Sequence, residues 1–293
     1  MYKLDSHHHC WIYNPVEYGW IDDKMAIIRR DFLLGDLERE FSAAGIHAAI
    51  SVQARQTLEE TRWLLELAQS HDFIQGVVGW VPLINPRVGA QLERLAENPK
   101  LRAVRHVLQD EPDGYMLRDD FNRGIREVTR LALAYDVLIF ERQLPTAIQF
   151  VDLHPNQTFI VDHLAKPPVK RNELSPWHEN LKDLARRPNV YCKLSGLATE
   201  AEHANWTPEQ LSPYIDAVIE IFSPQRVMFG SDWPVCLLAI EYTQWAALVS
   251  QAIRSLSPSE QARIWSGTAL EAYRIGYPPG GQPAHTIEDP TGQ

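Results

Sequence analysis

Three histidines near the start of the chain are the residues best suited to chemistry. They stand together in the stretch Asp-Ser-His7-His8-His9-Cys-Trp. Because side chains alternate across a β-strand, His7 and His9 are expected to point to one side of a strand and His8 to the other. Two convergent imidazoles can bind a metal ion or stabilise an anionic intermediate. The segment therefore predicts a site built on the first strand.

Length and charge limit the classes of function. The chain has 293 residues, 45% hydrophobic composition and a net charge of -10, which suits one large core. The acidic excess argues against a nucleic-acid partner, because phosphate binding needs clustered Lys and Arg. No stretch approaches the roughly 18 apolar residues of a membrane span, and no signal peptide is recognisable. Three cysteines far apart in the sequence favour a reducing compartment over a disulfide framework. We expect a cytoplasmic protein without membrane partners, whose homo-oligomerisation the sequence leaves open.

Short β-rich runs alternate with helical patterns along the whole chain, which is typical of a parallel sheet with crossover helices. Thr57 with Glu60 has the form of a capping box, which predicts a helix start. The predicted strands are 2–9, 46–53, 73–81, 101–107, 136–140, 158–163, 189–195 and 226–231, and amphipathic helices are predicted at 34–44, 57–70, 121–134, 177–187 and 208–222.

The alternation and the length together predict an α/β fold of the (β/α)₈ TIM-barrel type, which typically needs roughly 250 residues. An open doubly wound sheet is the alternative, but no Gly-x-Gly-x-x-Gly follows the first strand. We predict one barrel domain over residues 1–275. The stretch 276–293 is rich in Pro and Gly with few apolar residues, so it is predicted to be a disordered tail.

Polar residues follow most of the predicted strands, at the end where a (β/α)₈ barrel carries its chemistry. Each has a structural explanation when taken alone: Asp232 could end a strand in a turn, Glu141 and Arg142 could form an ordinary ion pair, and Lys193 could reach solvent. Their repetition at one end, each after an apolar run, favours a site. The residues are His7, His8 and His9, Arg105 and His106, Glu141 and Arg142, Asp162 and His163, Lys193 and Ser195, and Ser231 and Asp232.

This pattern resembles the amidohydrolase superfamily, in the first-strand His-x-His, in Phe-Ile-Val-Asp-His163 and in Met-Phe-Gly-Ser-Asp232-Trp-Pro. More narrowly, the chain is similar to the sugar-lactonase branch from Leu4 to about Ile275. The blocks that carry this likeness are Asp-Ser-His-His-His-Cys-Trp, Val-Val-Gly-Trp80, Val-Arg-His106-Val-Leu-Gln-Asp-Glu-Pro, Phe-Glu-Arg-Gln-Leu-Pro145, Asp-His163-Leu-Ala-Lys-Pro, Cys-Lys-Leu-Ser-Gly196-Leu and Gly-Ser-Asp-Trp-Pro-Val-Cys236.

The resemblance implies that His7, His9 and His163 are metal ligands and that Asp232 is both a ligand and the general base. Binuclear members of the superfamily place His at the ends of two adjacent later strands, whereas this chain has only His163 there, so a two-metal centre is not expected. One divalent ion, zinc first, fits three imidazoles or two with a carboxylate. The resembling branch also includes lactonases that work without a metal, so both cases stay open.

The function implied is hydrolysis of a sugar lactone to the sugar acid, with Asp232 as the base that activates water. The imidazoles, His163 among them, would hold the developing oxyanion, with Lys193 as an additional donor. A polyhydroxylated ring asks for several hydrogen bonds and one flat apolar surface. Candidate substrate-binding residues are Arg105, His106, Glu141, Arg142 and Trp233.

The sequence is also compatible with other functions. Arg105 and Arg142 could instead face the carboxylate of an aromatic acid in a metal-dependent decarboxylase, or the carboxylates of a dicarboxylated ring lactone. An amide hydrolase could use the same barrel. A barrel that binds a sugar lactone without turnover is a rival of another class, but binding a neutral sugar does not require an acid-base carboxylate and three imidazoles.

Overall fold

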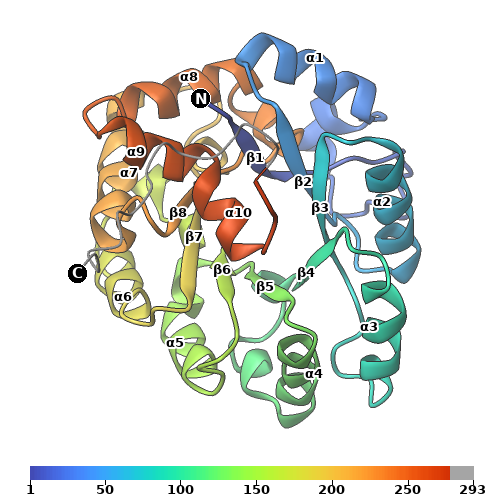
Figure 1. The fold of residues 1–293 in the computed structure, drawn as a ribbon. Coiled ribbons are helices and arrows are strands. Elements are labelled where there is room, and N and C mark those ends of the chain that lie inside the picture. Colours follow the sequence, from blue (N-terminus) through green and yellow to red (C-terminus); the bar gives the residue numbers. More distant parts are fainter. Residues whose placement is uncertain (278–293) are drawn as a thin grey trace, which may run out of the picture.

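Eight parallel strands form a single sheet in chain order, each hydrogen-bonded to the next (Figure 1). The computed structural model describes residues 1–277. The strands are β1 (Leu4–His8), β2 (Ala48–Val52), β3 (Ile74–Gly79), β4 (Leu101–His106), β5 (Ala134–Val137), β6 (Phe159–Val161), β7 (Val190–Leu194) and β8 (Val227–Phe229). The predicted (β/α)₈ barrel is confirmed.

The last strand meets the first just beyond their ends. The backbone N–H of Asp232 donates to the carbonyl of His7 at 2.8 Å, and the N–H of His9 donates to the carbonyl of Trp233 at 2.7 Å. The buried carboxylate of Asp5 accepts further backbone N–H groups from both sides of this seam. The seam therefore fixes the His-x-His segment against the segment that carries Asp232.

Helices surround the strands and cover the outer face of the sheet, as Figure 1 shows. The α-helices are α1 (Leu34–Ala44), α2 (Leu58–Ser70), α3 (Val88–Ala96), α4 (Asp119–Arg130), α5 (Leu144–Asp152), α6 (Trp177–Leu184), α7 (Pro208–Phe222), α8 (Tyr242–Ala252), α9 (Pro258–Ala262) and α10 (Thr268–Ala272). Shorter helical turns are η1 (Asp23–Ile28), η2 (Leu108–Asp110), η3 (Asp113–Leu117), η4 (Glu141–Gln143), η5 (Asp162–Ala165), η6 (Val169–Arg171), η7 (Ala198–Glu200), η8 (Val235–Leu238) and the π-helical η9 (Arg263–Gly267).

The interior of the barrel has its own apolar core, separate from the core between strands and helices. Inward-facing side chains such as Ile50, Val78 and Met228 pack with Leu270 and Tyr273, which come from α10 and the residue that follows it. Figure 1 shows α10 across the centre of the ring of strands. The same core contains Leu4, Ala48 and Ala134, the first residues of β1, β2 and β5. Helix α10 therefore closes the N-terminal end of the barrel.

The predicted elements agree with the structure except at their boundaries. Helices α1 and α7 have the predicted bounds, whereas α3, α5, α8, α9 and α10 lie outside the predicted helical ranges. The fifth strand was predicted at 136–140 but runs from Ala134 to Val137. The predicted range was wrong because Leu138 and Ile139 are buried beyond the end of the strand, and a continuous apolar run does not mark where pairing stops.

The predicted capping box at the start of α2 forms only in part. The Thr57 hydroxyl accepts the N–H of Glu60 at 3.1 Å, as expected. The Glu60 carboxylate, however, accepts the N–H groups of Ala54 and Arg55 in the preceding loop. Glu60 thus shapes the loop after β2, which lies beside the site.

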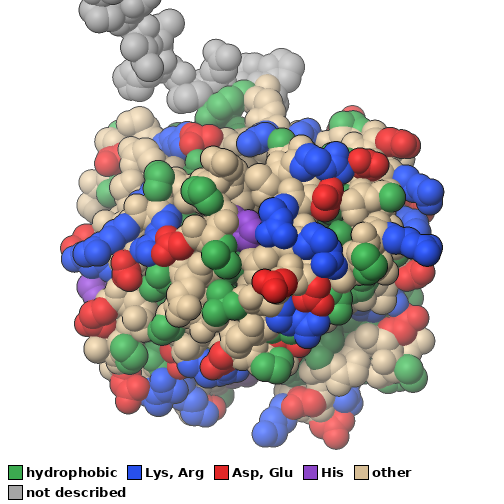
Figure 2. Space-filling view, turned by 90° about the horizontal axis from the view of Figure 1, so that it is seen from below, with side chains coloured by type: hydrophobic (Ala, Val, Ile, Leu, Met, Phe, Trp, Pro, Cys, Tyr) green, Lys and Arg blue, Asp and Glu red, His purple; other side chains and the backbone are tan. Residues whose placement is uncertain are grey.

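Three further expectations concern the whole molecule. The predicted tail at 276–293 lies outside the described residues, apart from its first two. Within residues 1–277 no helix combines the length and the apolar character needed to cross a bilayer. The three cysteines are buried and none forms a disulfide, which agrees with the expectation of a chain without a disulfide framework. On the face drawn in Figure 2, Lys and Arg side chains lie among Asp and Glu side chains.

Candidate functional site

The four residues expected to bind a metal come together at the C-terminal ends of the strands. His7 lies in β1 and His9 just beyond it, while His163 and Asp232 follow β6 and β8. The Nε2 atoms of His7 and His9 are 3.2 Å apart. Oδ1 of Asp232 lies 3.4 Å from Nε2 of His9, 3.7 Å from Nε2 of His7 and 3.8 Å from Nε2 of His163. His8 points elsewhere and bonds Ser51, as strand alternation predicted.

Hydrogen bonds behind the imidazoles fix how two of them face the centre. Nδ1 of His9 lies 2.8 Å from the carbonyl oxygen of Val52, which can only accept, so this nitrogen carries the hydrogen and Nε2 keeps its lone pair. Nδ1 of His163 lies 2.8 Å from the Ser195 hydroxyl. A Cβ at Gly196 would stand 2.6 Å from that same Nδ1, and Gly196 has a φ of +60°. Only glycine leaves room for the His163 ring in its observed position.

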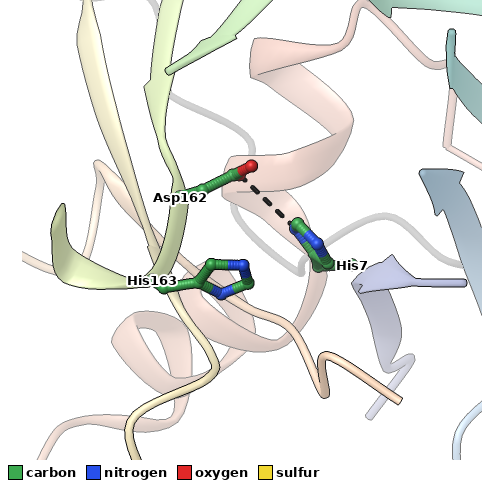
Figure 3. A group of neighbouring side chains, drawn as sticks. All are labelled: His7, Asp162 and His163. Carbon is green, nitrogen blue, oxygen red and sulfur yellow. Dashed lines mark ion pairs between the residues drawn. The ribbon is translucent and has the colours of Figure 1, made fainter. Parts of the chain in front are cut away.

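A second group of charged residues lies deeper in the barrel, fully or almost fully buried. Nζ of Lys193 is 2.5 Å from Oδ2 of Asp136, 2.9 Å from Oδ1 of Asp162 and 3.1 Å from Nδ1 of His7. The Arg105 guanidinium donates to Oδ2 of Asp162 at 3.0 Å. Figure 3 shows Asp162 pointing to His7, with the His163 ring beside them. The lysine predicted as an oxyanion donor is therefore held among carboxylates beneath His7.

Burial sets the protonation states at the site. Burial, helped by the charge of Lys193, holds the pKa of His7 well below its usual value, and burial lowers the pKa of His163 to about 4. Burial opposes ionisation of Asp232, but neighbouring His163, His9 and Lys166 outweigh it and keep the pKa of Asp232 below its ordinary value. At neutral pH the site therefore has neutral His7 and His163 next to an ionised carboxylate.

A cavity of about 330 Å³ opens onto this cluster. The buried residues His9, His163, Asp232 and Arg105 line it, together with the partly buried Lys166. The remaining lining residues are Glu17, Trp20, Ala54, Arg55, Gln56, Thr57, Val107, Gln109, Asp110, Leu138 and Val235. The cavity thus joins one ionised carboxylate and two imidazoles to a rim with many hydrogen-bonding groups.

Two of the predicted substrate-binding residues are buried away from this cavity. Nε2 of His106 lies 2.9 Å from a carboxylate oxygen of Glu111, and its other ring nitrogen accepts from the indole of Trp80. Trp233 is buried and packs its ring edge-on against Phe32. Neither appears among the cavity-lining residues of the described chain.

Glu141 and Arg142 also lie outside the cavity lining that the described residues form. Glu141 forms an ion pair with Arg171, and the half-exposed Arg142 forms one with Asp113. Both residues are thus engaged in ordinary ion pairs, although not with each other as the sequence suggested. Of the five predicted substrate-binding residues, the structure brings only Arg105 to the cavity.

Sequence reasoning also missed residues that the structure brings to the site. Asp162 was named among the polar strand-end residues but was given no role, and Lys166 belongs to the same Asp-His-Leu-Ala-Lys-Pro block, so proximity in sequence was an available signal. Asp136 stands inside an apolar strand, where an isolated carboxylate needs a buried partner. Arg55 follows β2 and lines the cavity, but nothing in its local pattern sets it apart.

The donor groups of this site fit one divalent ion. Two groups of three ligand atoms each lie within 4.8 Å of one another, namely His7 with His9 and Asp232, and His7 with Asp162 and His163. In the second group both oxygens of Asp162 already face Lys193 and Arg105. In the first group the orientation of His9 leaves Nε2 free for a ligand bond. The first group is therefore the better place for an ion.

Fold and site together define a (β/α)₈ barrel enzyme with an imidazole and carboxylate centre at the C-terminal ends of its strands. The model of one family, described as amidohydrolase, matches residues 4–275. The chain belongs to the amidohydrolase family and is a hydrolase.

Three relatives make this likeness specific. The chain is 41% identical to an L-fucono-1,5-lactonase of Burkholderia multivorans, over 94% of this chain and 97% of that protein. It is 37% identical to an L-fucono-1,5-lactonase of Burkholderia ambifaria, over 97% and 99% of the two chains. A crystal structure of an amidohydrolase from Burkholderia multivorans with bound zinc matches with a TM-score of 0.90 and 40% identity, covering 94% of this chain and all of that one.

Proposed function

We propose that this protein hydrolyses a sugar lactone of the L-fuconolactone type to the open-chain sugar acid. The observation that carries the proposal is the approach of Asp232 to three imidazoles, two of which line the cavity with it. The two Burkholderia lactonases, alike over nearly the whole chain, support the choice of substrate class.

In the proposed mechanism Asp232 takes a proton from a water molecule as that water attacks the lactone carbonyl carbon. The carbon–oxygen bond of the ring then breaks, and the protonated Asp232 returns its proton to the departing ring oxygen. Its low pKa keeps Asp232 ionised and ready to accept a proton at neutral pH. Hydrogen-bond donors from the His163 ring and from Arg105 stabilise the developing negative charge on the carbonyl oxygen.

A divalent ion, zinc first, would be held by His7, His9 and Asp232, with His163 beside them. When bound, such an ion lowers the pKa of water and polarises a carbonyl. The same protein groups also suffice for a route without an ion, since a lactone is more reactive than an amide. Lys193 then acts from beneath His7, fixing the ring rather than touching substrate.

The charges around the cavity favour a neutral substrate over the dicarboxylated lactone and the aromatic acid. Three acidic and three basic residues line the cavity, and each basic residue is paired: Arg55 with Glu17, Arg105 with Asp162 and Lys166 with Glu200. For these two alternative substrates Arg142 was expected to face a carboxylate together with Arg105. Arg142 instead lies on the surface, paired with Asp113. A balanced, hydrogen-bonding rim suits a polyhydroxylated ring.

The proposal is tested by following acid release from a panel of aldonolactones, a dicarboxylated pyrone lactone and a dihydroxybenzoate. We expect rapid hydrolysis of L-fuconolactone or a close stereoisomer, and no decarboxylation. Assays before and after removal of metal with a chelator, together with metal analysis and zinc re-addition, separate the two routes. Lactones that raise the melting temperature but stay intact would instead identify a non-catalytic binder and refute the proposal.

A further inference from the structure

The segment between His163 and Lys166 has an unusual backbone. All four residues have positive φ, at 51°, 56°, 56° and 49°. L-residues visit this left-handed region as single residues, and a run of four without glycine is strained. The N–H of Lys166 donates to the carbonyl of His163 at 2.7 Å, which closes one left-handed turn.

Packing on one side of the turn holds this strained backbone in place. Leu164 and Ala165 are completely buried in the core between strands and helices. The indole N–H of Trp177 donates to the carbonyl of Leu164 at 2.7 Å. Strain of this kind persists where the surroundings over-determine it, and it concentrates at functional sites.

The consequence of the turn is to bring two side chains to one place. Residues three apart in a helical turn share a side, and His163 and Lys166 both line the cavity while the two residues between them face the core. An extended chain after β6 would alternate its side chains and would not produce this pairing. The turn therefore places a primary amine beside the imidazole and carboxylate centre.

The ammonium of Lys166 has a charge partner but no short bond to it. Nζ lies 3.7 Å from Oε1 of Glu200, which is longer than a hydrogen bond. Glu200 ends the turn η7 that follows β7, and burial raises the pKa of its carboxyl. The pair balances charge, and at 3.7 Å it leaves the ammonium able to form a shorter hydrogen bond to a ligand.

The other cations at the cavity are more fully engaged. The Arg105 guanidinium donates to Asp162 and to the carbonyl of Gln53. Arg55 forms an ion pair with Glu17 through its guanidinium. Lys166 is therefore the cation best able to bond a ligand beside His163 and Asp232.

We propose that Lys166 is a catalytic residue of the lactonase reaction. Its ammonium donates a hydrogen bond to the acyl oxygen as negative charge develops there, and afterwards it pairs with the carboxylate of the sugar acid. Glu200 is a positioning residue that holds the ammonium over the cavity. This inference rests on the proposed function, because it concerns the same substrate at the same site.

The test compares Lys166→Met with Lys170→Met, a matched control. Lys170 lies four residues further along the same loop, is exposed and pairs with Glu202. We expect Lys166→Met to lower kcat/KM by roughly 100-fold, the size typical for loss of one transition-state donor. Inhibition by the product sugar acid should weaken by about tenfold or more, because a charge-assisted bond to its carboxylate is lost. Lys166→Arg should recover most of the inhibition, and Lys170→Met should match the wild type in both measurements.

The role of Glu200 is tested with Glu200→Gln and with the double variant. If Glu200 acts through Lys166, Glu200→Gln lowers kcat/KM in the wild type but has little further effect in Lys166→Met. Thermal unfolding confirms that each variant folds. Equal product inhibition in Lys166→Met and the wild type would overturn the inference, as would independent effects of the two substitutions.

Failure of the proposed function has a different signature. It would appear as a wild type that hydrolyses no lactone. Stabilisation of the wild type by sugar acids, compared with Lys166→Met, then still decides whether the ammonium pairs with a carboxylate at this site. Equal stabilisation of the two proteins would overturn the pairing.

Discussion

Two layers of charged residues lie in the barrel, and they differ in their access to water. The cavity layer, His9, His163 and Asp232, lines the open cavity. The buried layer, Lys193, Asp136 and Asp162, lies beneath it and is completely buried. Both layers contain carboxylates beside nitrogen bases. Residue types alone therefore do not identify a reactive group, because only the cavity layer is accessible to a substrate.

The two layers also satisfy their charges differently. In the buried layer Lys193 lies between two carboxylates, and the Tyr273 hydroxyl donates to Asp136 at 2.8 Å. Such pairing is required, since an unpaired buried charge is costly. Contacts of 3.4 to 3.8 Å surround Asp232 in the cavity layer. These are too long for strong hydrogen bonds, so the carboxylate remains able to bond water.

The largest effect on activity is expected at Asp232 in the cavity layer. We expect Asp232→Asn to lower kcat by roughly 10²- to 10⁴-fold, the usual contribution of a general base, with a much smaller change in KM. Asparagine tolerates the φ of 59° at this position, so the fold should be retained. Steady-state kinetics on the best lactone measure the effect.

The control for this change is Asp216→Asn on the exposed side of α7. It should leave the kinetics at the wild-type level. Near-normal turnover of Asp232→Asn would show that another group accepts the proton and that the cavity layer has been assigned incorrectly.

Substitutions in the buried layer should lower the free energy of unfolding. Lys193→Met leaves Asp136 and Asp162 without their shared cation, and breaking a buried pair in this way costs about 3–5 kcal/mol. Urea denaturation measures the free energy of unfolding. Lys182→Met, an exposed lysine of α6, should change it by less than about 0.5 kcal/mol.

A double variant sharpens this prediction. Adding Asp136→Asn to Lys193→Met removes one of the uncompensated charges and should recover part of the lost stability. A loss below about 1 kcal/mol for Lys193→Met alone would contradict the view that this layer depends on its charge pairing.

Glu60 extends the comparison to a buried carboxyl that is only partly satisfied. Its Oε1 has no hydrogen-bond partner within the described chain, and burial raises its pKa from 4.5 to about 7. The folded state therefore binds a proton between pH 4.5 and 7 that the unfolded state releases. From this group alone, stability falls as the pH rises through that range.

Glu60→Gln fixes the side chain in a neutral form and should remove this loss. Relative to wild type, the variant should gain up to about 3 kcal/mol of stability between pH 5 and pH 8, since one pKa unit corresponds to about 1.36 kcal/mol. Urea denaturation at both pH values measures the gain. A stability difference that is the same at pH 5 and pH 8 would mean that Glu60 is already ionised in the fold at the lower pH.

The sequence was sufficient to predict the barrel because its period is simple. Apolar runs of strand length alternate with amphipathic helices, and polar residues follow the strands at one end. The same pattern placed His7, His9, His163 and Asp232 among the polar strand-end residues, since strand order in such a barrel brings these ends together, and the resemblance to the amidohydrolase superfamily singled them out. Their meeting needed no knowledge of side-chain packing.

The rim of the cavity could not be predicted in this way. His106 and Trp233 follow strands just as Arg105 and Asp232 do, but their side chains turn into the protein. Lys166 reaches the cavity only because four residues adopt a left-handed turn, and local sequence preference argues against that turn. Tertiary packing decides these directions, and a strand pattern does not encode it.

The interior of the barrel is complete only after Tyr273 has been synthesised, late in translation. Its hydroxyl reaches Asp136 from beyond α10, at the end of the barrel opposite the cavity. A nascent chain that has passed β8 carries all eight strands, but it still lacks this cover and the phenol that bonds Asp136. Because domains generally fold as units, the first appearance of lactone hydrolysis on the ribosome should wait for emergence of residue 273 rather than residue 232.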